Sequence, residues 1–182
     1  MQTVRAAGTT TGSVAGKTRR LARIGVLVAA TAVAAQVAIP LPGSPVPVVL
    51  SNLMAVLAGL LLGPRDGAVA MVVYVLVGLA GVPVFAAGHA GAGVLVGPTG
   101  GYLVGFIVAA FLAGAVRRRN VWLATAAGMA VIYVLGLPWL AWTAHLTWKR
   151  AILLGAVPFL PGDALKTIAA AAVARAVPTP RG

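Results

Sequence analysis

Apolar runs of about 16 to 20 residues, separated by short clusters of proline, glycine and charged residues, make up most of this sequence. The runs lie at about residues 20–38, 48–63, 67–83, 99–116, 121–140 and 161–177. They lack the alternation of a barrel strand, and a backbone in hydrocarbon must satisfy its hydrogen bonds within its own segment. We therefore predict an all-α fold: a polytopic membrane protein with six transmembrane helices and Pro/Gly-rich extracellular loops.

Two long stretches of the chain contain no charged residue. None occurs between Arg23 and Arg65 or between Asp66 and Arg117, and each stretch is long enough to cross about 30 Å of hydrocarbon twice. Hydrophobic residues make up 60% of the chain and charged residues 9%, with a mean hydropathy of +1.01, whereas about a quarter of the residues in soluble domains are charged. This composition excludes an ordinary soluble domain and predicts membrane lipid as the surrounding medium.

We interpret the net charge of +12 as a signal for the orientation of the chain in the membrane and not for a nucleic-acid partner. The cations form short clusters between apolar runs and no continuous basic face, so we expect no binding of nucleic acid. All Lys and Arg except Lys149, Arg150 and Lys166 fall on one side of the predicted membrane. Cytoplasmic loops carry such an excess, so we predict a multi-pass protein of the cell membrane with both termini in the cytoplasm.

The predicted organisation is one membrane domain with a short tail at each end. Residues 1–19, rich in Thr, Gly, Ala and Ser, are predicted to form a disordered cytoplasmic tail. The six-helix transmembrane domain spans 20–177, and 178–182 form the C-terminal tail. The chain has no cysteine, which excludes disulfides, thiolate catalysis and cysteine-based metal sites.

One face of the first predicted helix carries small side chains. Ala22, Val26, Ala30 and Ala34 recur at a spacing of four and lie on one row of a helix. Small residues let two helices approach closely in lipid. The row is therefore either a packing face within the chain or a docking face for a partner membrane subunit.

Three longer connections lie on the side opposite most of the cations, at residues 39–47, 84–98 and 141–160. Four prolines between residues 40 and 47 remove four backbone donors and fix φ near about −65°, which makes this segment stiff and extended. It is either a spacer between helices or, given its apolar content, a lid. We expect 40–47 and 86–97 to be mobile in the ligand-free protein, because neither segment can hold regular structure.

Glycines crowd the second of these connections. Gly88, Gly91 and Gly93 surround His89, and glycine is favoured where a backbone bends sharply or approaches a ligand. Successive free N–H groups can form an anion-binding nest, although each glycine also fits a simple turn. Tyr102 points either into the bundle or into an interfacial aromatic belt.

The two acidic residues of the chain lie in different settings. Asp66 falls in a Gly-Pro-Arg-Asp-Gly segment, for which we predict a tight cytoplasmic turn. Asp163 begins the last apolar run, three residues before Lys166, so that both side chains share one helical face. Ionisable groups in such segments usually face an interior or a cavity. The pair is therefore either a helix cap with its partner or, as we favour, part of a binding site.

Five motifs occur in an order and at a spacing that resemble the BioY family, the biotin-specific S components of energy-coupling-factor transporters. They are residues 45–47 (PVP), 62–64 (LGP), 81–85 (GVPVF), 97–102 (GPTGGY) and 158–163 (PFLPGD), the last followed by Leu165 and Lys166. The resemblance extends from about residue 21 to residue 176. It departs after Pro47, where the family often has Thr and Gln two and four residues further on and this chain has Val49 and Ser51.

This resemblance implies a six-helix membrane subunit that captures biotin outside the cell. It would work with a transmembrane coupling subunit and two cytoplasmic ATPase subunits, or alone. The sequence contains no Gly-x-x-x-x-Gly-Lys-Ser/Thr motif, so the energy would come from a partner. The resemblance thus implies a transport protein with no enzymatic activity and no cofactor.

Biotin has a ureido ring with N–H donors and a carbonyl acceptor, an apolar thioether ring with an aliphatic tail, and a terminal carboxylate. With the resemblance as a guide, we expect Asp163 to accept from the ureido N–H groups and Lys166 to donate to the ureido carbonyl. The apolar part would rest on Val46, Val84, Phe85 and Tyr102. The carboxylate would meet either Lys166 or the backbone N–H groups near Gly88, His89, Gly91 and Gly93.

Three other functions fit parts of the sequence. An S component for another small vitamin would share most of these features. An intramembrane enzyme would use Asp163 with His89 and His145, but their spacing does not supply a further protein ligand for a metal. A channel or a structural scaffold would explain the helices but not the Pro-rich and Gly-rich loops. We therefore expect no catalytic residue and no metal site.

Overall fold

The computed structural model describes residues 8–177, with side chains from Val14 onward, and this part of the chain is almost entirely helical. Its elements are α1 (Gly8–Gln36), β1 (Ala38–Ile39), β2 (Val48–Val49), α2 (Ser51–Leu62), α3 (Pro64–Leu79), the 3-10 helix η1 (Ala86–Gly88), α4 (Ala92–Val96), α5 (Gly100–Val116), α6 (Val121–Thr143), α7 (Trp148–Gly155) and α8 (Leu160–Ala176). The six predicted apolar runs correspond in order to α1, α2, α3, α5, α6 and α8. The helical fold class is therefore confirmed, and a two-residue antiparallel ladder of β1 and β2 is added to it.

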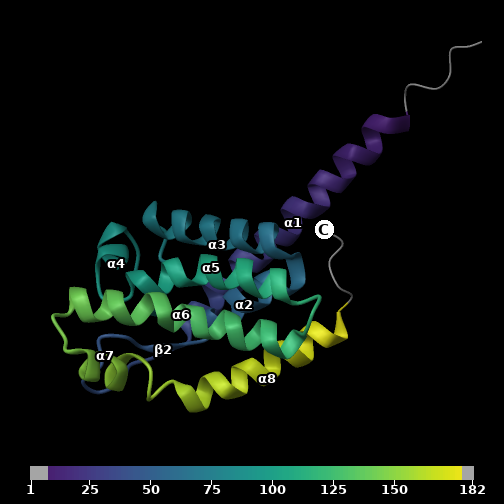
Figure 1. Ribbon diagram of the computed structural model, residues 1–182. Coiled ribbons are helices and arrows are strands. Elements are labelled where there is room, and N and C mark those ends of the chain that lie inside the picture. Colours follow the sequence, from purple (N-terminus) through teal and green to yellow (C-terminus); the bar gives the residue numbers. More distant parts are fainter. Residues whose placement is uncertain (1–7, 178–182) are drawn as a thin grey trace, which may run out of the picture.

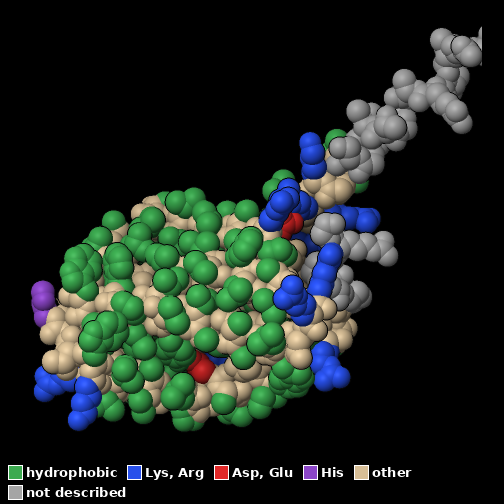
Figure 2. All heavy atoms as spheres, in the orientation of Figure 1, with side chains coloured by type: hydrophobic (Ala, Val, Ile, Leu, Met, Phe, Trp, Pro, Cys, Tyr) green, Lys and Arg blue, Asp and Glu red, His purple; other side chains and the backbone are tan. Residues whose placement is uncertain are grey.

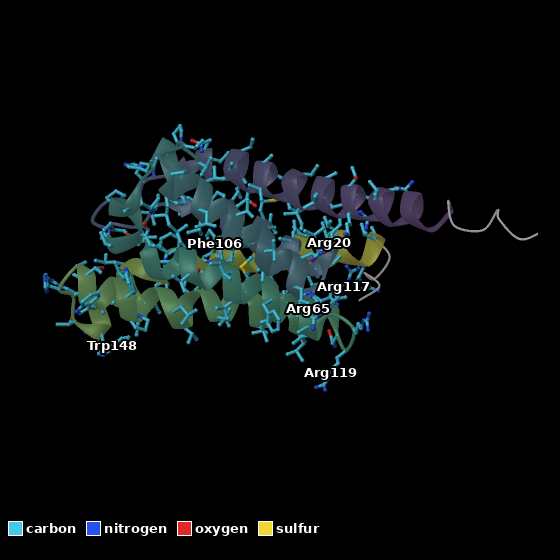
Figure 3. The ribbon with its side chains drawn as sticks, turned by 90° about the horizontal axis from the view of Figure 1, so that it is seen from above. Arg20, Arg65, Phe106, Arg117, Arg119 and Trp148 are labelled. Atoms are coloured by element: carbon cyan, nitrogen blue, oxygen red, sulfur yellow. The ribbon has the colours of Figure 1, made fainter. Side chains whose placement is uncertain are left out.

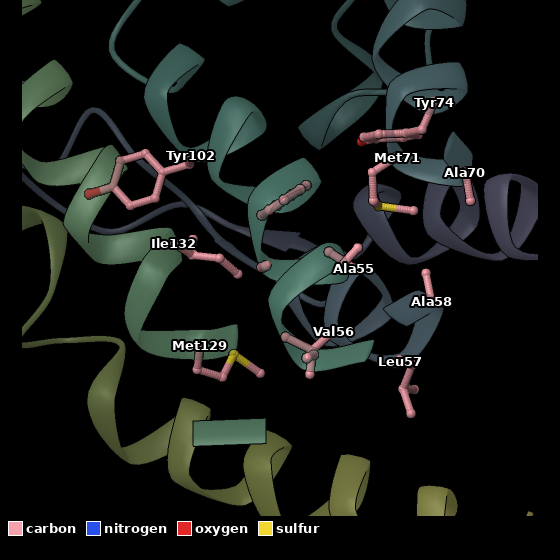
Figure 4. Packing of buried hydrophobic residues seen from close by; sticks show 14 of the residues in the cluster. Ala55, Val56, Leu57, Ala58, Ala70, Met71, Tyr74, Tyr102, Met129 and Ile132 are labelled. Carbon is pink, nitrogen blue, oxygen red and sulfur yellow. The ribbon is translucent and has the colours of Figure 1, made fainter. Parts of the chain in front are cut away.

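Helix α5 occupies the centre of the bundle (Figure 1). It packs against α6 and against α2 and α3, while α1 lies against α2 and α3, and α8 lies against α2 and α6. Figure 4 shows apolar side chains converging from several helices, among them Val56 of α2, Met71 of α3 and Met129 of α6. The core is thus built from faces of helices that are distant in the sequence.

Glycine permits the closest helix contact in the bundle interior. A Cβ atom at Gly59 of α2 would lie 1.9 Å from the carbonyl oxygen of Ala110 in α5. Since no side chain fits in that space, the backbones of α2 and α5 are in direct contact, as small residues allow between closely packed helices.

The two ends of the bundle differ in charge. Figure 3 shows one end, which we call the basic end, with Arg20, Arg65, Arg117 and Arg119. Figure 2 shows the same gathering of Lys and Arg, and a largely apolar surface over the helices between the ends. The opposite end, which we call the loop end, carries the connections 37–50, 80–99 and 144–159.

Among the described helices, length and apolar character together support fewer membrane spans than six. Among the described helices, α6, with 23 residues, is long and apolar enough to cross a membrane, and α7 and α8 reach that length only together, with a bend of 54° between them. The apolar helices α2 and α5 have 12 and 17 residues, fewer than the about 20 that a perpendicular span requires.

The N-terminal segment differs from its prediction. Helix α1 begins at Gly8, so residues 8–19 are helical where a disordered tail is expected. No proline precedes position 40, and a helix that has nucleated in its buried part propagates with little resistance. The rest of the predicted N-terminal tail, 1–7, and the C-terminal tail, 178–182, lie outside the described residues.

Asp66 helps to hold α1 in place. It lies in the first turn of α3, where a negative charge is favourable, rather than in the tight turn that the sequence predicts. Its carboxylate accepts two hydrogen bonds from Arg20 Nε, at 2.9 and 2.8 Å, and one from Nη2 at 2.6 Å. Because the pair is exposed to water, we ascribe to it only a modest contribution to stability.

Arg117, at the end of α5, is the buried cation of the basic end, with 5% of its surface exposed. Its Nη1 donates to the carbonyl of Leu60 near the end of α2. Its Nη2 donates to the carbonyls of Ala174 and Val177 at the end of α8, at 2.5 and 2.6 Å. The last carbonyls of a helix have no partner within the helix, so one guanidinium satisfies the ends of two helices.

We expect Arg117→Met to lower the free energy of unfolding by about 1–3 kcal/mol, because it leaves buried carbonyl groups without donors. Thermal unfolding of the purified protein in detergent measures the change. Arg119→Met, at an exposed position of the same turn, is the matched control and should unfold at the wild-type temperature. Equal melting temperatures for the two variants would show that Arg117 does not tie the helix ends together.

Candidate functional site

A cavity of about 490 Å³ opens at the loop end, within the range of small-molecule sites. Helices α2, α3, α5, α6 and α8 contribute to it, together with the connections at the loop end. Its wall is mainly apolar and aromatic, and includes Val46, Phe85, Tyr102, Leu103, Phe106, Ile132 and Phe159. Such a lining fits a ligand with an apolar body and few polar groups.

Asp163 and Lys166 face this cavity from the first two turns of α8. Lys166 Nζ lies 2.8 Å from Asp163 Oδ1, and both side chains are more than nine-tenths buried. The N-cap residue of α8 is Phe159, and the side chain of Asp163 makes no capping hydrogen bond. The interpretation of Asp163 as a simple helix cap is therefore wrong, whereas its predicted pairing with Lys166 is present.

The carboxylate of Asp163 receives hydrogen bonds from three side chains. Asn52 Nδ2 donates to Oδ1 at 3.0 Å, and Lys166 Nζ donates to the same oxygen. The hydroxyl of Tyr133, on α6, donates to Oδ2. A buried carboxylate needs such partners, and here they come from α2, α6 and α8.

The ammonium group of Lys166 is fully engaged. Besides Asp163, it donates to the backbone carbonyl of Val49 at 2.7 Å and to Asn52 Oδ1 at 3.1 Å. Val49 thus contributes a backbone carbonyl, at the end of β2, and no polar side chain. The four side chains of Asn52, Tyr133, Asp163 and Lys166 form what we call the polar cluster.

Seven of the ten residues predicted for the site line the cavity: Val46, Phe85, His89, Gly93, Tyr102, Asp163 and Lys166. Tyr102 points into the bundle, and its hydroxyl donates to the carbonyl of Gly155 at 3.0 Å, so the belt interpretation is wrong.

The other three residues, Val84, Gly88 and Gly91, do not line it. The Val84 carbonyl accepts from the hydroxyl of Tyr74 at 3.0 Å. The N–H groups of Gly88 and Gly91 donate to the carbonyls of Phe85 and Gly78 at 3.1 and 2.8 Å, and are not available to a ligand. The N–H groups of Gly88 and Gly91 in the predicted nest are thus occupied, one by the loop itself and one by the end of α3.

Asn52, Tyr133, Phe106 and Phe159 line the cavity but were not predicted as site residues. A signal existed for Asn52 and Tyr133, since each is a polar residue within an apolar run. Phe159 lies in the motif at 158–163, which is a weaker signal, and nothing in the sequence distinguishes Phe106 from an ordinary core residue.

The connections at the loop end are more ordered than predicted. Residues 86–97 contain η1 and α4, and residues 40–47 are closed by the ladder of β1 and β2. Ser44 Oγ donates to the carbonyl of Leu154 in α7 at 2.8 Å, which fixes the Pro-rich segment beside the cavity. The expectation that no regular structure forms is wrong for 86–97, where local hydrogen bonds compensate for the glycines, whereas 40–47 contain turns and bends but no helix or strand of their own.

The described residues contain no group of three His, Cys, Asp or Glu side chains placed to hold a metal ion.

Residues 5–181 match the model of the BioY family. The chain is 36% identical to the probable biotin transporter BioY of Pyrococcus horikoshii over 158 residues, which cover 87% of this chain and 95% of that relative. It is 40% identical to the biotin transporter BioY of Thermotoga maritima over 161 residues, 86% of this chain and 94% of the relative. The fold is similar to a crystal structure of the S-component for biotin from an ECF-type ABC transporter, with a TM-score of 0.77 and 24% identity over 93% of this chain and 94% of the other. The resemblance predicted from the motifs is confirmed.

Proposed function

The chain belongs to the BioY family, and we propose that it is a membrane-embedded, non-enzymatic subunit that binds biotin for uptake. The observation that carries this proposal is the polar cluster at the cavity, with the buried ion pair of Asp163 and Lys166. An ion pair away from water presents an acceptor and a donor side by side, which is the complement of a ureido group.

The ureido N–H groups would meet the side of the cluster that holds Asp163. A carboxylate has about four acceptor positions, and the cluster uses three of them. The hydroxyl group of Tyr133 donates its hydrogen bond to Asp163, and its oxygen can accept from the second N–H group. Lys166 would donate to the ureido carbonyl.

The rest of biotin would lie along the apolar wall, with its carboxylate toward His89 and Gly93, which line the cavity. The Nδ1 atom of His89 lies 2.7 Å from the carbonyl of Ala86, so Nδ1 donates to this carbonyl and holds the ring beside the cavity. Gly88 and Gly91 have no part in this arrangement, since their N–H groups donate to the carbonyls of Phe85 and Gly78.

We also propose that the six helices α1, α2, α3, α5, α6 and α8 cross the cell membrane with the basic end in the cytoplasm and the loop end outside. The excess of cations at one end supports this orientation. A transmembrane coupling subunit and two ATPase subunits would supply the energy for release of biotin inside the cell, because the sequence contains no P-loop motif.

Calorimetric titration of the detergent-purified protein tests the proposal. We expect saturable binding of biotin and no binding of thiamine, which has no ureido group, or of riboflavin, whose ring offers one N–H group between two carbonyls and not two N–H groups beside one carbonyl. Saturable binding of another vitamin, with none of biotin, would identify an S component of different specificity.

We expect biotin to slow amide exchange in residues 86–97 by about ten-fold, equivalent to about 1.4 kcal/mol of local stabilisation. The reason is that His89 and Gly93 would contact the ligand, which then opposes opening of this segment. Prolines lack an amide, so residues 40–47 need a spin label, and Pro42→Cys provides an exposed site in a chain that has no native cysteine.

Amides in the interior of α6 serve as the internal reference for this experiment and should exchange equally with and without biotin. Unchanged exchange in 86–97, together with an unchanged spectrum of the label at saturating biotin, would show that the cavity is preformed and open.

A further inference from the structure

The side chain of Asn52 bridges the two charged groups of the polar cluster. Its Nδ2 donates to Asp163 Oδ1 at 3.0 Å, and its Oδ1 accepts from Lys166 Nζ at 3.1 Å. An amide has an N–H donor and a carbonyl acceptor on the same carbon atom, and so has each half of a ureido group. Asn52 therefore makes the hydrogen bonds that the ureido ring of biotin is proposed to make.

The ammonium group of Lys166 has no donor to spare for a ligand. Its three protons are used by Val49 O, Asn52 Oδ1 and Asp163 Oδ1. A ligand carbonyl can accept from Lys166 only if one of these bonds is given up. The bond to Asn52 is the longest of the three, at 3.1 Å.

Asn52 is also the partner that can move with the least disturbance. The Val49 carbonyl belongs to the backbone of β2, which is paired with β1, and Asp163 is the counter-ion of the lysine. The amide of Asn52 swings away by rotation of its side chain, with loss of a further bond in which Oδ1 accepts from the N–H group of Leu53 at 2.9 Å.

We propose that Asn52 is an internal substitute for the ligand: its amide occupies the ion pair while the cavity is empty and leaves it when a ureido group arrives. The proposal rests on the proposed function in biotin binding. In the empty protein the amide keeps a buried ion pair hydrogen-bonded and aligned, which would otherwise be a destabilising arrangement. In binding it is a competitor, so it lowers affinity and restricts entry to ligands that supply both an N–H donor and a carbonyl.

The test is whether Asn52→Ala raises or lowers the affinity for biotin. Loss of an internal competitor should tighten biotin binding by about 2- to 10-fold, the equivalent of one net hydrogen bond, and should lower the melting temperature of the ligand-free protein. A residue whose side chain instead contacts biotin in the complex would weaken binding when it is truncated. Calorimetry and thermal unfolding of the same preparations measure both quantities.

The matched control is Asn120→Ala, at the only other asparagine of the chain. Asn120 caps α6 at the basic end, where its side chain accepts from Trp122 N and Leu123 N. Its loss should lower the melting temperature without a change in biotin affinity, which separates general destabilisation from release of the ion pair. Asn52→Ser, whose side chain is too short to bridge both charged groups, carries the same prediction if Asn52→Ala does not fold.

Weaker or unchanged biotin binding in a folded Asn52 variant would overturn the inference while leaving the proposed function intact. Absence of biotin binding by the wild-type protein would remove the proposed function and this inference with it. Tighter binding together with lower stability of the ligand-free Asn52 variant, and unchanged affinity in Asn120→Ala, would support it.

Discussion

Lys166→Met is expected to weaken biotin binding by ten-fold or more, and Asp163→Asn to do the same, in proteins that remain folded. Each substitution removes one member of a buried pair and leaves the other in the same cavity with fewer partners. Breaking a buried pair in this way lowers the free energy of unfolding by about 3–5 kcal/mol. Each also removes a charge-assisted bond to the ureido group, worth about 1.5–3 kcal/mol. Calorimetric titration measures the affinities, and size-exclusion chromatography in detergent verifies the fold.

Lys149→Met is the matched control, since it removes an exposed lysine of α7 at the same end of the molecule. It should bind biotin with wild-type affinity. If folded Lys166→Met and Asp163→Asn proteins also bind with wild-type affinity, the site lies elsewhere and the cavity has another role.

The charge pair was predictable because helical geometry alone brings positions three apart to one face. Asp163 and Lys166 need only a helix to meet, and the long apolar run after them predicts one. Asn52 and Tyr133 join them only through the packing of α2 and α6 against α8, which no local pattern specifies. A polar side chain in an apolar run signals a function, but not the identity of its partner.

The loops and the N-terminal segment show where composition is a weak guide. Glycine content in 84–98 suggested a flexible nest, yet the N–H group of Gly88 donates within its own turn, that of Gly91 donates to the carbonyl of Gly78 in α3, and α4 forms beside them. Composition likewise suggested a disordered tail before residue 20, whereas α1 continues to Gly8 because nothing in this segment interrupts a helix. Composition describes an average conformational preference, and hydrogen bonds to particular groups decide which conformation a segment adopts.

Arg117 was counted among the cytoplasmic cations, and the structure gives it a different setting. Its neighbour Arg119 is exposed, as the orientation rule expects, while Arg117 is buried and donates to the ends of α2 and α8. These two helices carry Asn52 and Asp163 near their opposite ends. The charge pattern of the sequence cannot separate a cation that sets orientation from one that holds helices together.

Ala30→Trp on α1 is expected to reduce biotin uptake by cells by about ten-fold or more while leaving biotin binding by the isolated subunit unchanged. One side of α1 is buried in the bundle, with Ile24, Leu27 and Thr31 at most 8% exposed. The other side is open, with Val26 64% and Val33 70% exposed, and Ala30 lies at the boundary between them. A smooth, open helix face allows close approach of a partner helix, and a bulky ring prevents it. A loss of about 1.4 kcal/mol in docking already reduces assembly ten-fold.

The matched control is Val134→Trp, which places the same ring on an exposed position of α6. A ring that only meets lipid should leave both uptake and binding at the wild-type level. Equal losses of uptake and binding in Ala30→Trp would show that the row of small residues serves packing within the chain. Unchanged uptake would show that this face of α1 contacts lipid alone, and docking of a coupling subunit would then have to use another surface. Radiolabelled uptake into cells that express the complete transporter, paired with calorimetry on the purified subunit, separates these three outcomes, because docking to a partner contributes to the first measurement and not to the second.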